Sequence, residues 1–520
     1  MHPWIRRASA VVAILCPTLL ALGTPQRVRA EPVDVGYRDF YYGVIVNSTP
    51  TGEKPESKLW FNDGIWWGTL WDSLAGRYEI HRFNPGTQSW STTGVPIDDR
   101  HSTKGDALWD GEHLYVASHI FTTSAGPTVP VNSARLYRFS YNSVSKTYTP
   151  NIGFPILINS SKSETLVLDK DSTGRLWVTW MEAGRAKINC SLGSDILWGT
   201  PFDLPVQSAD ATTDDVCSLI AFGGNKIGVF WSNQITRDNR FAIHVDTDPP
   251  GTWQPSELVS TNPTGEPLSD DHISLKTHAG MVYAVTKTNE TVPTQPLVLL
   301  NRRDVSGNWT VHVVGTKAEN HTRAILLLDP EHDLLHVLAT CALEGRNRIY
   351  RKTASMSAMV FAGGRGDLFI DSPSDPKLGN VSSTKQNITS QTGMLAIASE
   401  QDTRYYFHNY YATPPTADVP WSSLGRGESL LSMAPSQPNP FRRSTRIPFS
   451  LRTTGSVELA VYDLNGRKIR ELLDRELPAG DHSETWDGRD DRGLPVPGGV
   501  YFARLAGSGG TAWQRLVILR

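Results

Sequence analysis

The chain has 520 residues and a formal net charge of −3, so no overall basic field favours nucleic-acid binding. This length exceeds one ordinary hydrophobic core and predicts two or more domains. Sixteen Trp, 43 Gly and 34 Pro, without long helical periodicity, indicate many short strands joined by turns.

The N-terminus carries the pattern of an export signal. Arg6 and Arg7 precede an apolar run at 8–23, and Val28-Arg29-Ala30 offers a cleavage site of the small-residue type. This order predicts a signal peptide over 1–30, with the mature chain beginning at residue 31. The run is short and interrupted by a proline, so an uncleaved anchor is the less favoured alternative. We therefore expect a secreted or cell-surface protein with no membrane span after signal cleavage.

A strand–turn–strand pattern recurs seven times along the next part of the chain. The repeats cover 57–72, 105–121, 163–181, 217–233, 273–289, 323–341 and 386–401. A third strand follows most of them, and a period of roughly 55 residues suits a four-stranded antiparallel unit. Such units cannot bury a core alone, but radially arranged sheets pack on one another. We therefore predict an all-β, seven-bladed β-propeller over 31–412, with six blades as the alternative because the last repeat is the most degenerate.

A ring of blades has to be closed by pairing its two ends. The alternating segment 39–47 precedes the first repeat, and 403–411 is the last strand signal of this region. We expect 39–47 to complete the blade that the final repeat begins.

The composition changes beyond residue 412. Residues 413–437 are rich in Pro, Ser and Gly and predict a linker. From 438 to 520 alternation returns, with six or seven short strands, which is typical of a small antiparallel sandwich. The stretches "PNPFRRSTRIPFSL" and "VELAVYDLNGRKIREL" resemble FlgD-type immunoglobulin-like domains and the related sorting domains of type IX secreted bacterial proteins. That resemblance implies a bacterial surface or secreted protein that engages secretion machinery, and it implies no catalysis.

Charged residues recur just ahead of the first strand of each repeat. Because the first strands of propeller blades are innermost, these residues are expected to form a ring around the mouth of the central channel. The candidate ligand-binding residues are Lys58, Lys104, Lys162, Glu164, Asp215, Asp270, Asp271, Lys276 and Lys385. The candidate catalytic residues are His272, His321 and Arg323. Glu56 and Asp214 are further acids of the same ring.

Three interpretations of this ring stay open. The charges could pair with neighbours and with water inside a narrow channel, which is a purely structural role. They could bind a glycan, since cations attract an acidic ligand and carboxylates accept hydrogen bonds from sugar hydroxyls. They could also serve a polysaccharide lyase or a glycoside hydrolase, with His272 or His321 as base beside Arg323 or Lys276. A propeller that binds only proteins is the remaining alternative.

The propeller region resembles the sialidase-like, BNR-type superfamily of secreted bacterial propellers, through "SETLVLDKDSTGRLWVTW", "NKIGVFWSNQ" and "DDHISLK". A weaker likeness in "DDHISLK" is to propeller lyases of acidic polysaccharides. The Asp boxes of true sialidases are off-pattern at 246–253 and 304–309, and the "RIP" sequence at 446–448 lies in the sandwich. The resemblance thus implies the fold and leaves sialidase activity unsupported.

Aromatic and sulfur-containing residues are expected to be structural. Core packing between blades is favoured over sugar stacking for the tryptophans nearest the ring, Trp60, Trp66, Trp67, Trp71 and Trp231. Beyond the signal segment the cysteines are Cys190, Cys217 and Cys341, an odd number without metal-ligand spacing. We expect them to be buried small side chains, with a Cys190–Cys217 disulfide as the alternative. The acidic turns lack a complete calcium loop, so no metal and no cofactor are expected.

Overall fold

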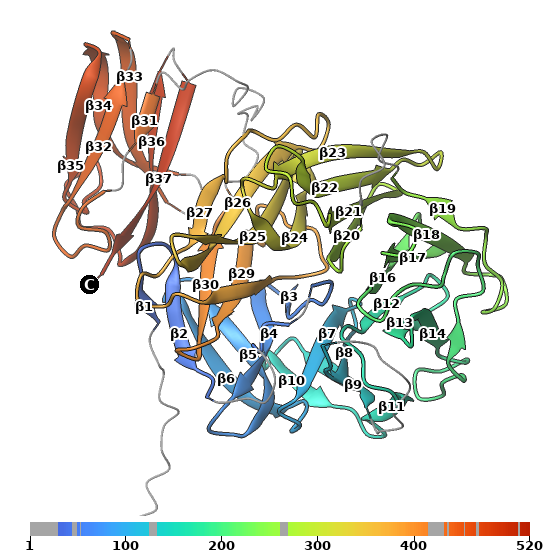
Figure 1. Cartoon of the computed structure of the whole chain (residues 1–520). Helices are drawn as coiled ribbons and strands as arrows, with labels where there is room; N and C mark the ends of the chain where they lie inside the picture. Colours follow the sequence, from blue (N-terminus) through green and yellow to red (C-terminus); the bar gives the residue numbers. More distant parts are fainter. Residues whose placement is uncertain are drawn as a thin grey trace, which may run out of the picture.

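The structure is a computed structural model that describes residues 30–43, 49–52, 54–123, 133–260, 269–413, 431–433, 436–451, 453–463, 467–507 and 510–519. All but residue 30 of the expected signal peptide lies outside these ranges. Seven antiparallel sheets, five of four strands and two of five, surround one axis (Figure 1). The prediction of an all-β, seven-bladed propeller is therefore confirmed, and the six-bladed alternative is wrong.

The first three blades follow one another along the chain. Blade 1 contains β3 (Leu59–Asn62), β4 (Ile65–Asp72), β5 (Arg77–Asn84) and β6 (Ser89–Pro96). Blade 2 contains β7 (Thr103–Trp109), β8 (His113–Ile120), β9 (Ala134–Asn142), β10 (Thr147–Pro150) and β11 (Ile156–Asn159). Blade 3 contains β12 (Val167–Lys170), β13 (Leu176–Glu182), β14 (Arg185–Cys190) and β15 (Phe202–Asp203). In blade 2 both β10 and β11 pair with β9.

The next three blades repeat this order. Blade 4 contains β16 (Cys217–Phe222), β17 (Lys226–Asn233), β18 (Asp238–Val245) and β19 (Glu257–Leu258). Blade 5 contains β20 (Ile273–His278), β21 (Met281–Lys287), β22 (Pro296–Arg303) and β23 (Trp309–Thr316). Blade 6 contains β24 (His321–Asp329), the short 3₁₀ helix η1 (Pro330–His332), β25 (Leu334–Leu343), β26 (Arg346–Ser355) and β27 (Asp367–Ile370). In each blade the first strand lies nearest the axis (Figure 1).

Blade 7 joins the two ends of the propeller chain. Its strand order is β1 (Glu31–Pro32), β2 (Tyr37–Tyr41), β30 (Tyr405–Tyr411), β29 (Met394–Glu400) and β28 (Leu378–Ser382). The N-terminal strand thus completes the last blade, as predicted, although it covers 37–41 and part of the expected range 39–47 lies outside the described residues. A buried contact between Asp39 and His408, 2.8 Å from carboxylate oxygen to Nδ1, adds to the pairing of β2 with β30.

The core consists of apolar and aromatic side chains packed between neighbouring blades. The five tryptophans proposed for packing are all buried, which confirms that they fill the interior. Cys190, Cys217 and Cys341 are buried and free, so the disulfide alternative is not formed.

The C-terminal sandwich contains two antiparallel sheets. Its strands are β31 (Leu431–Met433), β32 (Thr445–Leu451), β33 (Gly455–Tyr462), β34 (Lys468–Leu477), β35 (Gly480–Trp486), β36 (Gly499–Gly507) and β37 (Gly510–Ile518). One sheet has the order β31-β32-β35 and the other β34-β33-β36-β37, with Trp486, Leu459 and Leu505 in the core between them. The first of these strands lies within the range expected to be a linker.

Blade 7 is also bound to blade 1 near the axis. The Gln386 side chain accepts a hydrogen bond from the Phe61 amide at 2.7 Å and donates one to the Phe61 carbonyl at 3.0 Å. This side chain therefore takes the place of a neighbouring strand beside Phe61 in β3, and it satisfies both backbone groups of that residue.

We expect Gln386→Ala to destabilise the propeller by about 1–3 kcal/mol, because it leaves the Phe61 amide and carbonyl without their partners. Urea unfolding followed by tryptophan fluorescence measures this change. Gln254→Ala, in which an exposed side chain is removed, is the matched control and should leave the midpoint unchanged. Equal midpoints for the two variants would contradict the role given to Gln386.

Candidate functional site

A polar cavity of about 590 Å³ opens where the inner strands begin, and we call it the mouth cavity. Acidic residues line one side of it, from the segments that lead into blades 3, 4 and 5. Cations and amides line the other side, from blades 6 and 7. Its charged lining residues are Lys54, Glu164, Asp214, Asp271, Arg323 and Lys377, and its amides are Asn320, Asn347, Asn380 and Gln401.

The floor of the mouth cavity is formed by Lys54, which comes from the segment ahead of β3. Its buried Nζ lies 2.6 Å from Glu164 Oε1 of blade 3 and also contacts Asp271 of blade 5. Although burial alone would lower it, these two carboxylates raise the pKa of Lys54. The ammonium group is therefore held in its charged form, and it connects three blades across the axis.

A second cavity of about 240 Å³, the channel cavity, lies among the inner strands and is also lined by Lys54. Lys276 and Lys385 line it, and Lys385 Nζ lies 2.8 Å from the buried carboxylate of Asp106. Burial and the nearby charge of Lys385 lower the pKa of Lys276 to about 7. Since Lys54 lines both cavities, it separates the mouth from the channel interior.

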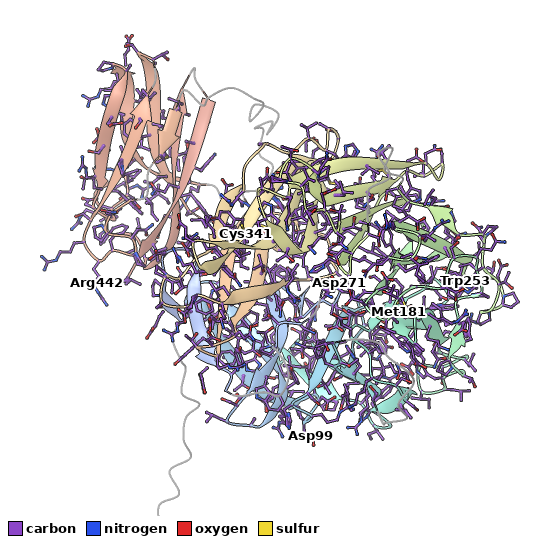
Figure 2. All side chains as sticks on the ribbon, in the orientation of Figure 1. Asp99, Met181, Trp253, Asp271, Cys341 and Arg442 are labelled. Atoms are coloured by element: carbon purple, nitrogen blue, oxygen red, sulfur yellow. The ribbon has the colours of Figure 1, made fainter. Side chains whose placement is uncertain are left out.

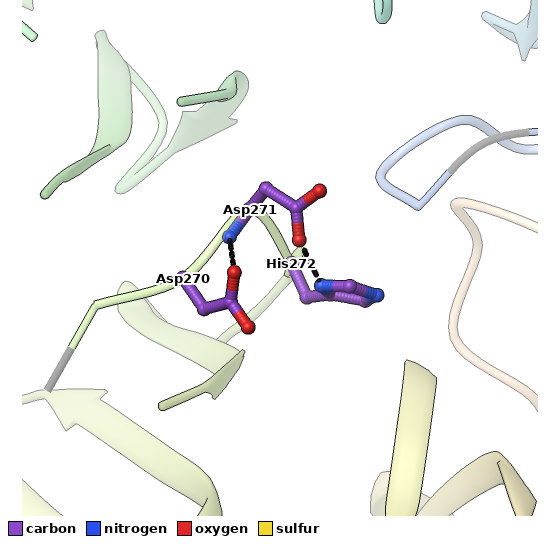
Figure 3. A group of neighbouring side chains, drawn as sticks. All are labelled: Asp270, Asp271 and His272. Atoms are coloured by element: carbon purple, nitrogen blue, oxygen red, sulfur yellow. Dashed lines mark hydrogen bonds and ion pairs between the residues drawn. The ribbon is translucent and has the colours of Figure 1, made fainter. Parts of the chain in front are cut away.

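Asp270, Asp271 and His272 form a compact group at the entrance to β20 (Figure 3). Asp270 Oδ1 accepts a hydrogen bond from the Asp271 amide at 2.8 Å, and its carboxylate also pairs with Lys287. Asp271 Oδ1 lies 2.5 Å from His272 Nδ1. Although burial opposes the shift, contacts with His272 and Lys54 lower the pKa of Asp271 well below its usual range. This aspartate is therefore a permanent anion near the axis (Figure 2).

His272 is buried beneath this anion and does not line the mouth cavity. Its Nε2 lies 3.4 Å from the hydroxyl of Thr322, and Thr322 does line the cavity. Burial lowers the pKa of His272 although Asp271 opposes this. A ligand in the mouth cavity would therefore meet the Thr322 hydroxyl, and the neutral imidazole of His272 lies behind that hydroxyl.

Four residues that line the mouth cavity, Lys54, Asn320, Arg323 and Asn380, have a positive φ, and two of them lie within strands. Arg323 in β24 and Asn380 in β28 both have φ of 52°, in the left-handed region that side chains other than glycine seldom adopt. Each lies where the pairing with the next strand shifts register, between Thr322 and Ile325 and between Gly379 and Ser382. Such β-bulges re-aim side chains, and each strained residue costs about 1–3 kcal/mol. Neighbouring blades 6 and 7 thus carry the same distortion at the same cavity.

The structure brings only part of the predicted ring together at the mouth. Among the candidate residues, Glu164, Asp271 and Arg323 line the mouth cavity, while Lys276 and Lys385 line the channel cavity. Asp214 takes the place expected for Asp215, because Asp215 is buried and accepts hydrogen bonds from Thr212 and Ser232. Asp270 and the exposed Lys162 line neither cavity.

Three further candidates turn into the protein instead of the mouth. Lys58 is buried against Glu56, at 2.9 Å, and the backbone of blade 2. Lys104 lies inside β7, where it donates to the Thr49 carbonyl. His321 packs within blade 6, with Nε2 3.0 Å from the Arg365 carbonyl oxygen. The expectation that these residues face the mouth is wrong, because each satisfies a neighbouring strand or segment.

Lys385 was misplaced because the first strand of blade 7 begins earlier than its repeat suggested. The last repeat, 386–401, predicts that the inner strand begins at residue 386, whereas β28 covers 378–382 and contains the bulge at Asn380. Lys385 therefore follows the inner strand and points into the channel. The sequence patterns do not single out Lys54 or Asn380.

The comparisons with known proteins concern the two domains separately. A family model described as FlgD Ig-like domain matches residues 445–510. The basal-body rod modification protein FlgD of Salmonella typhimurium is 34% identical over 94 residues, which are 18% of this chain and 38% of that protein. The chain thus spans well under half the length of this curated relative. The C-terminal domain is a FlgD Ig-like domain, in agreement with the resemblance seen in the sequence.

Solved structures with a similar arrangement include a PL25 ulvan lyase, at 10% identity and a TM-score of 0.48, covering 72% of this chain and 96% of that one. Another is PorZ, a surface component of the type-IX secretion system of Porphyromonas gingivalis, at 15% identity and a TM-score of 0.39, covering 93% and 63%. Because both TM-scores are below 0.5, these likenesses say nothing about activity or ligand.

The ring contains one ion pair whose pH dependence can be tested directly. Glu56 Oε2 lies 2.9 Å from Lys58 Nζ, and Oε1 lies 2.6 Å from His119 Nε2. Although burial alone would raise it, Lys58 and His119 lower the pKa of Glu56 to about 2. Relative to the ordinary value of 4.5, this corresponds to about 3 kcal/mol of folding stability.

Because the folded-state pKa is lowered, this stabilisation is complete above pH 4.5 and is lost as the pH falls toward 2. We expect Glu56→Gln to unfold more easily at pH 7 and to lose less further stability between pH 4.5 and 2. Urea midpoints across that range measure both effects. Glu112→Gln, at an exposed carboxylate, should keep the wild-type dependence of the urea midpoint on pH. If the urea midpoint of Glu56→Gln changes with pH as the wild type does, Glu56 is not held as an anion.

Proposed function

We propose that this protein is an exported bacterial surface protein whose propeller binds an acidic glycan at the mouth cavity. The observation that carries the proposal is the pair of strained residues, Arg323 and Asn380, that line the same cavity from adjacent blades. Strain of this kind persists where the surrounding structure holds it for a purpose, and functional sites are where it gathers.

The charge distribution in the cavity supports a ligand with both acidic groups and hydroxyls. On the acidic side, the single charge of Lys54 offsets part of the negative charge of Glu164 and Asp271. On the other side, Arg323 supplies a planar donor group that suits carboxylates and sulfates, and amide side chains flank it. An acidic sugar can therefore place its charged group against blades 6 and 7 and its hydroxyls toward the carboxylates.

A polysaccharide lyase is the second candidate, and the contact between His272 and Thr322 is the observation in its favour. A neutral imidazole is a competent base, and the Thr322 hydroxyl in front of it can pass a proton from a bound substrate. In the lyase step, the proton next to the uronate carboxylate would pass through Thr322 to His272 while Arg323 stabilises that carboxylate. The C4=C5 double bond forms as the C4–O bond breaks, and the departing oxygen takes up the proton.

The FlgD Ig-like domain supports placement at the cell surface. We propose that the N-terminal 30 residues direct export and that the C-terminal domain engages surface or secretion machinery. Within the residues that the structure describes, no helix is both long enough and apolar enough to cross a membrane. The resemblance of the propeller to the sialidase-like superfamily remains a prediction.

A glycan array probed with residues 31–520 tests the proposal. We expect binding to at least one uronate-containing or sulfated polysaccharide, and roughly a ten- to hundredfold loss of affinity in Arg323→Ala and Asn380→Ala. The control is Lys226→Ala, because Lys226 lies where β17 begins, at the opposite end of the channel. No binding to any acidic glycan, or equal binding by all three variants, would refute it and favour a protein ligand.

The enzyme alternative has its own readout. Incubation with the polysaccharides that bind should release products with the ultraviolet absorbance of an unsaturated uronate if the lyase is correct. His272→Gln should then lose turnover while it retains binding, since His272 does not line the cavity. Binding without any absorbance change assigns the mouth cavity to recognition alone.

A further inference from the structure

We propose that the propeller has a second, separate carbohydrate site for a neutral sugar on its outer part, between blades 2 and 3. A cavity of about 410 Å³ lies there, and we call it the rim cavity. It is lined by the end of β11, by β13 and β14, and by the loop that leads from β14 to β15. Its volume lies within the range of small-molecule sites.

The rim cavity has an apolar wall built around an indole. Trp198 is half-buried in it, and Leu157 and Ile196 stand beside it with 49% and 57% of their surface exposed. Leu192 and Leu197 of the same loop are exposed to 42% and 57%. Exposed aliphatic groups gathered around an aromatic ring mark a surface that is covered by a ligand, whereas scattered single ones do not.

This wall is held in a fixed shape by hydrogen bonds. The Leu192 amide donates to the Leu197 carbonyl at 2.7 Å, and the Gly199 amide donates to the Cys190 carbonyl at 3.0 Å. The Trp198 indole donates to the Asp195 carbonyl at 2.9 Å, and the Asp195 carboxylate lies 2.6 Å from the Arg138 guanidinium of blade 2. The exposure of Ile196 is therefore a property of an ordered loop that is bonded to both blades.

The floor of the rim cavity is polar. Asn159, only 3% exposed, uses its Oδ1 to accept a hydrogen bond from the Ser161 amide at 2.6 Å. Its Nδ2 is buried and has no hydrogen-bond partner among the described residues. A buried amide donor without a partner is unfavourable and is usually satisfied by a ligand or an ordered water. Glu182 and Ser161 add acceptor and hydroxyl groups at the same floor.

An apolar wall above a polar floor fits a neutral pyranose better than it fits the other classes of ligand. A pyranose has an apolar C–H face that stacks on an indole and a hydroxyl edge that both donates and accepts hydrogen bonds. No Lys, Arg or His is among the residues that line the rim cavity, so an acidic sugar would find no counter-ion there. This distinguishes it from the mouth cavity, and the proposal does not depend on what the mouth cavity binds.

Saturation-transfer NMR on residues 31–520 tests the second site. The probes are the methyl glycosides of glucose, galactose, mannose, xylose, rhamnose and fucose, with methyl glucuronide as the acidic comparison. We expect at least one neutral glycoside to bind, with Trp198→Ala weakening it roughly tenfold. Ile196→Asp, at an exposed position that tolerates a polar residue, should weaken it as well without changing the melting temperature.

Two variants serve as controls. Trp253 has the same local arrangement in blade 4, with its indole donating to the carbonyl three residues earlier at 3.0 Å, and it lies at the periphery of the ring (Figure 2). Trp253→Ala should leave glycoside binding unchanged, and so should Arg323→Ala in the mouth cavity. If no neutral glycoside binds, if methyl glucuronide binds more tightly than methyl glucoside to the Arg323→Ala variant, or if Trp198→Ala and Ile196→Asp bind normally, the proposal is wrong.

Discussion

A ring of seven sheets leaves a space on its axis, and how that space is filled determines the rest of this structure. The inner strands are too far apart across the ring to pack directly, and the chain places Thr49 and residues 54–57 near the axis. The buried ammonium of Lys54 reaches Glu164 of blade 3 and Asp271 of blade 5 from there. Removing charges from water is unfavourable unless they are well paired, and here each member has a partner.

The same principle extends to the strands around the axis. Asp106 in β7 accepts hydrogen bonds from the Ser57 and Leu168 amides, both at 2.8 Å, and so joins blade 2 to blades 1 and 3. Glu56 accepts from the Leu166 amide at 3.1 Å while it pairs with Lys58 and His119. Part of the charged ring is thus structural, and the mouth cavity is what remains open above it. A functional surface and a structural network share one set of acids here, which explains why spacing alone could not separate them.

The hairpin repeats identified the blades because alternation and turn residues act locally. Closure by β2 was also predictable, since an unpaired strand at each end of a ring has one partner available. The site was less predictable for reasons that depend on backbone shape. In a regular strand His321 and Arg323 would face the same side, but the left-handed conformation at Arg323 turns it into the cavity and leaves His321 inside the blade. Nothing in residue spacing reports such a bulge, or the path of the segment that contains Lys54.

The closure of blade 7 also determines how the molecule responds to mechanical load. The chain leaves the propeller from β30, and this strand is hydrogen-bonded to β29 on one side and to β2 on the other. A pull on the chain beyond Tyr411 therefore acts along two rows of hydrogen bonds at once, in shear, instead of peeling an edge strand away one bond at a time. If the propeller is attached through its C-terminal domain, as we propose, it would in this way transmit a pulling force without opening its ring.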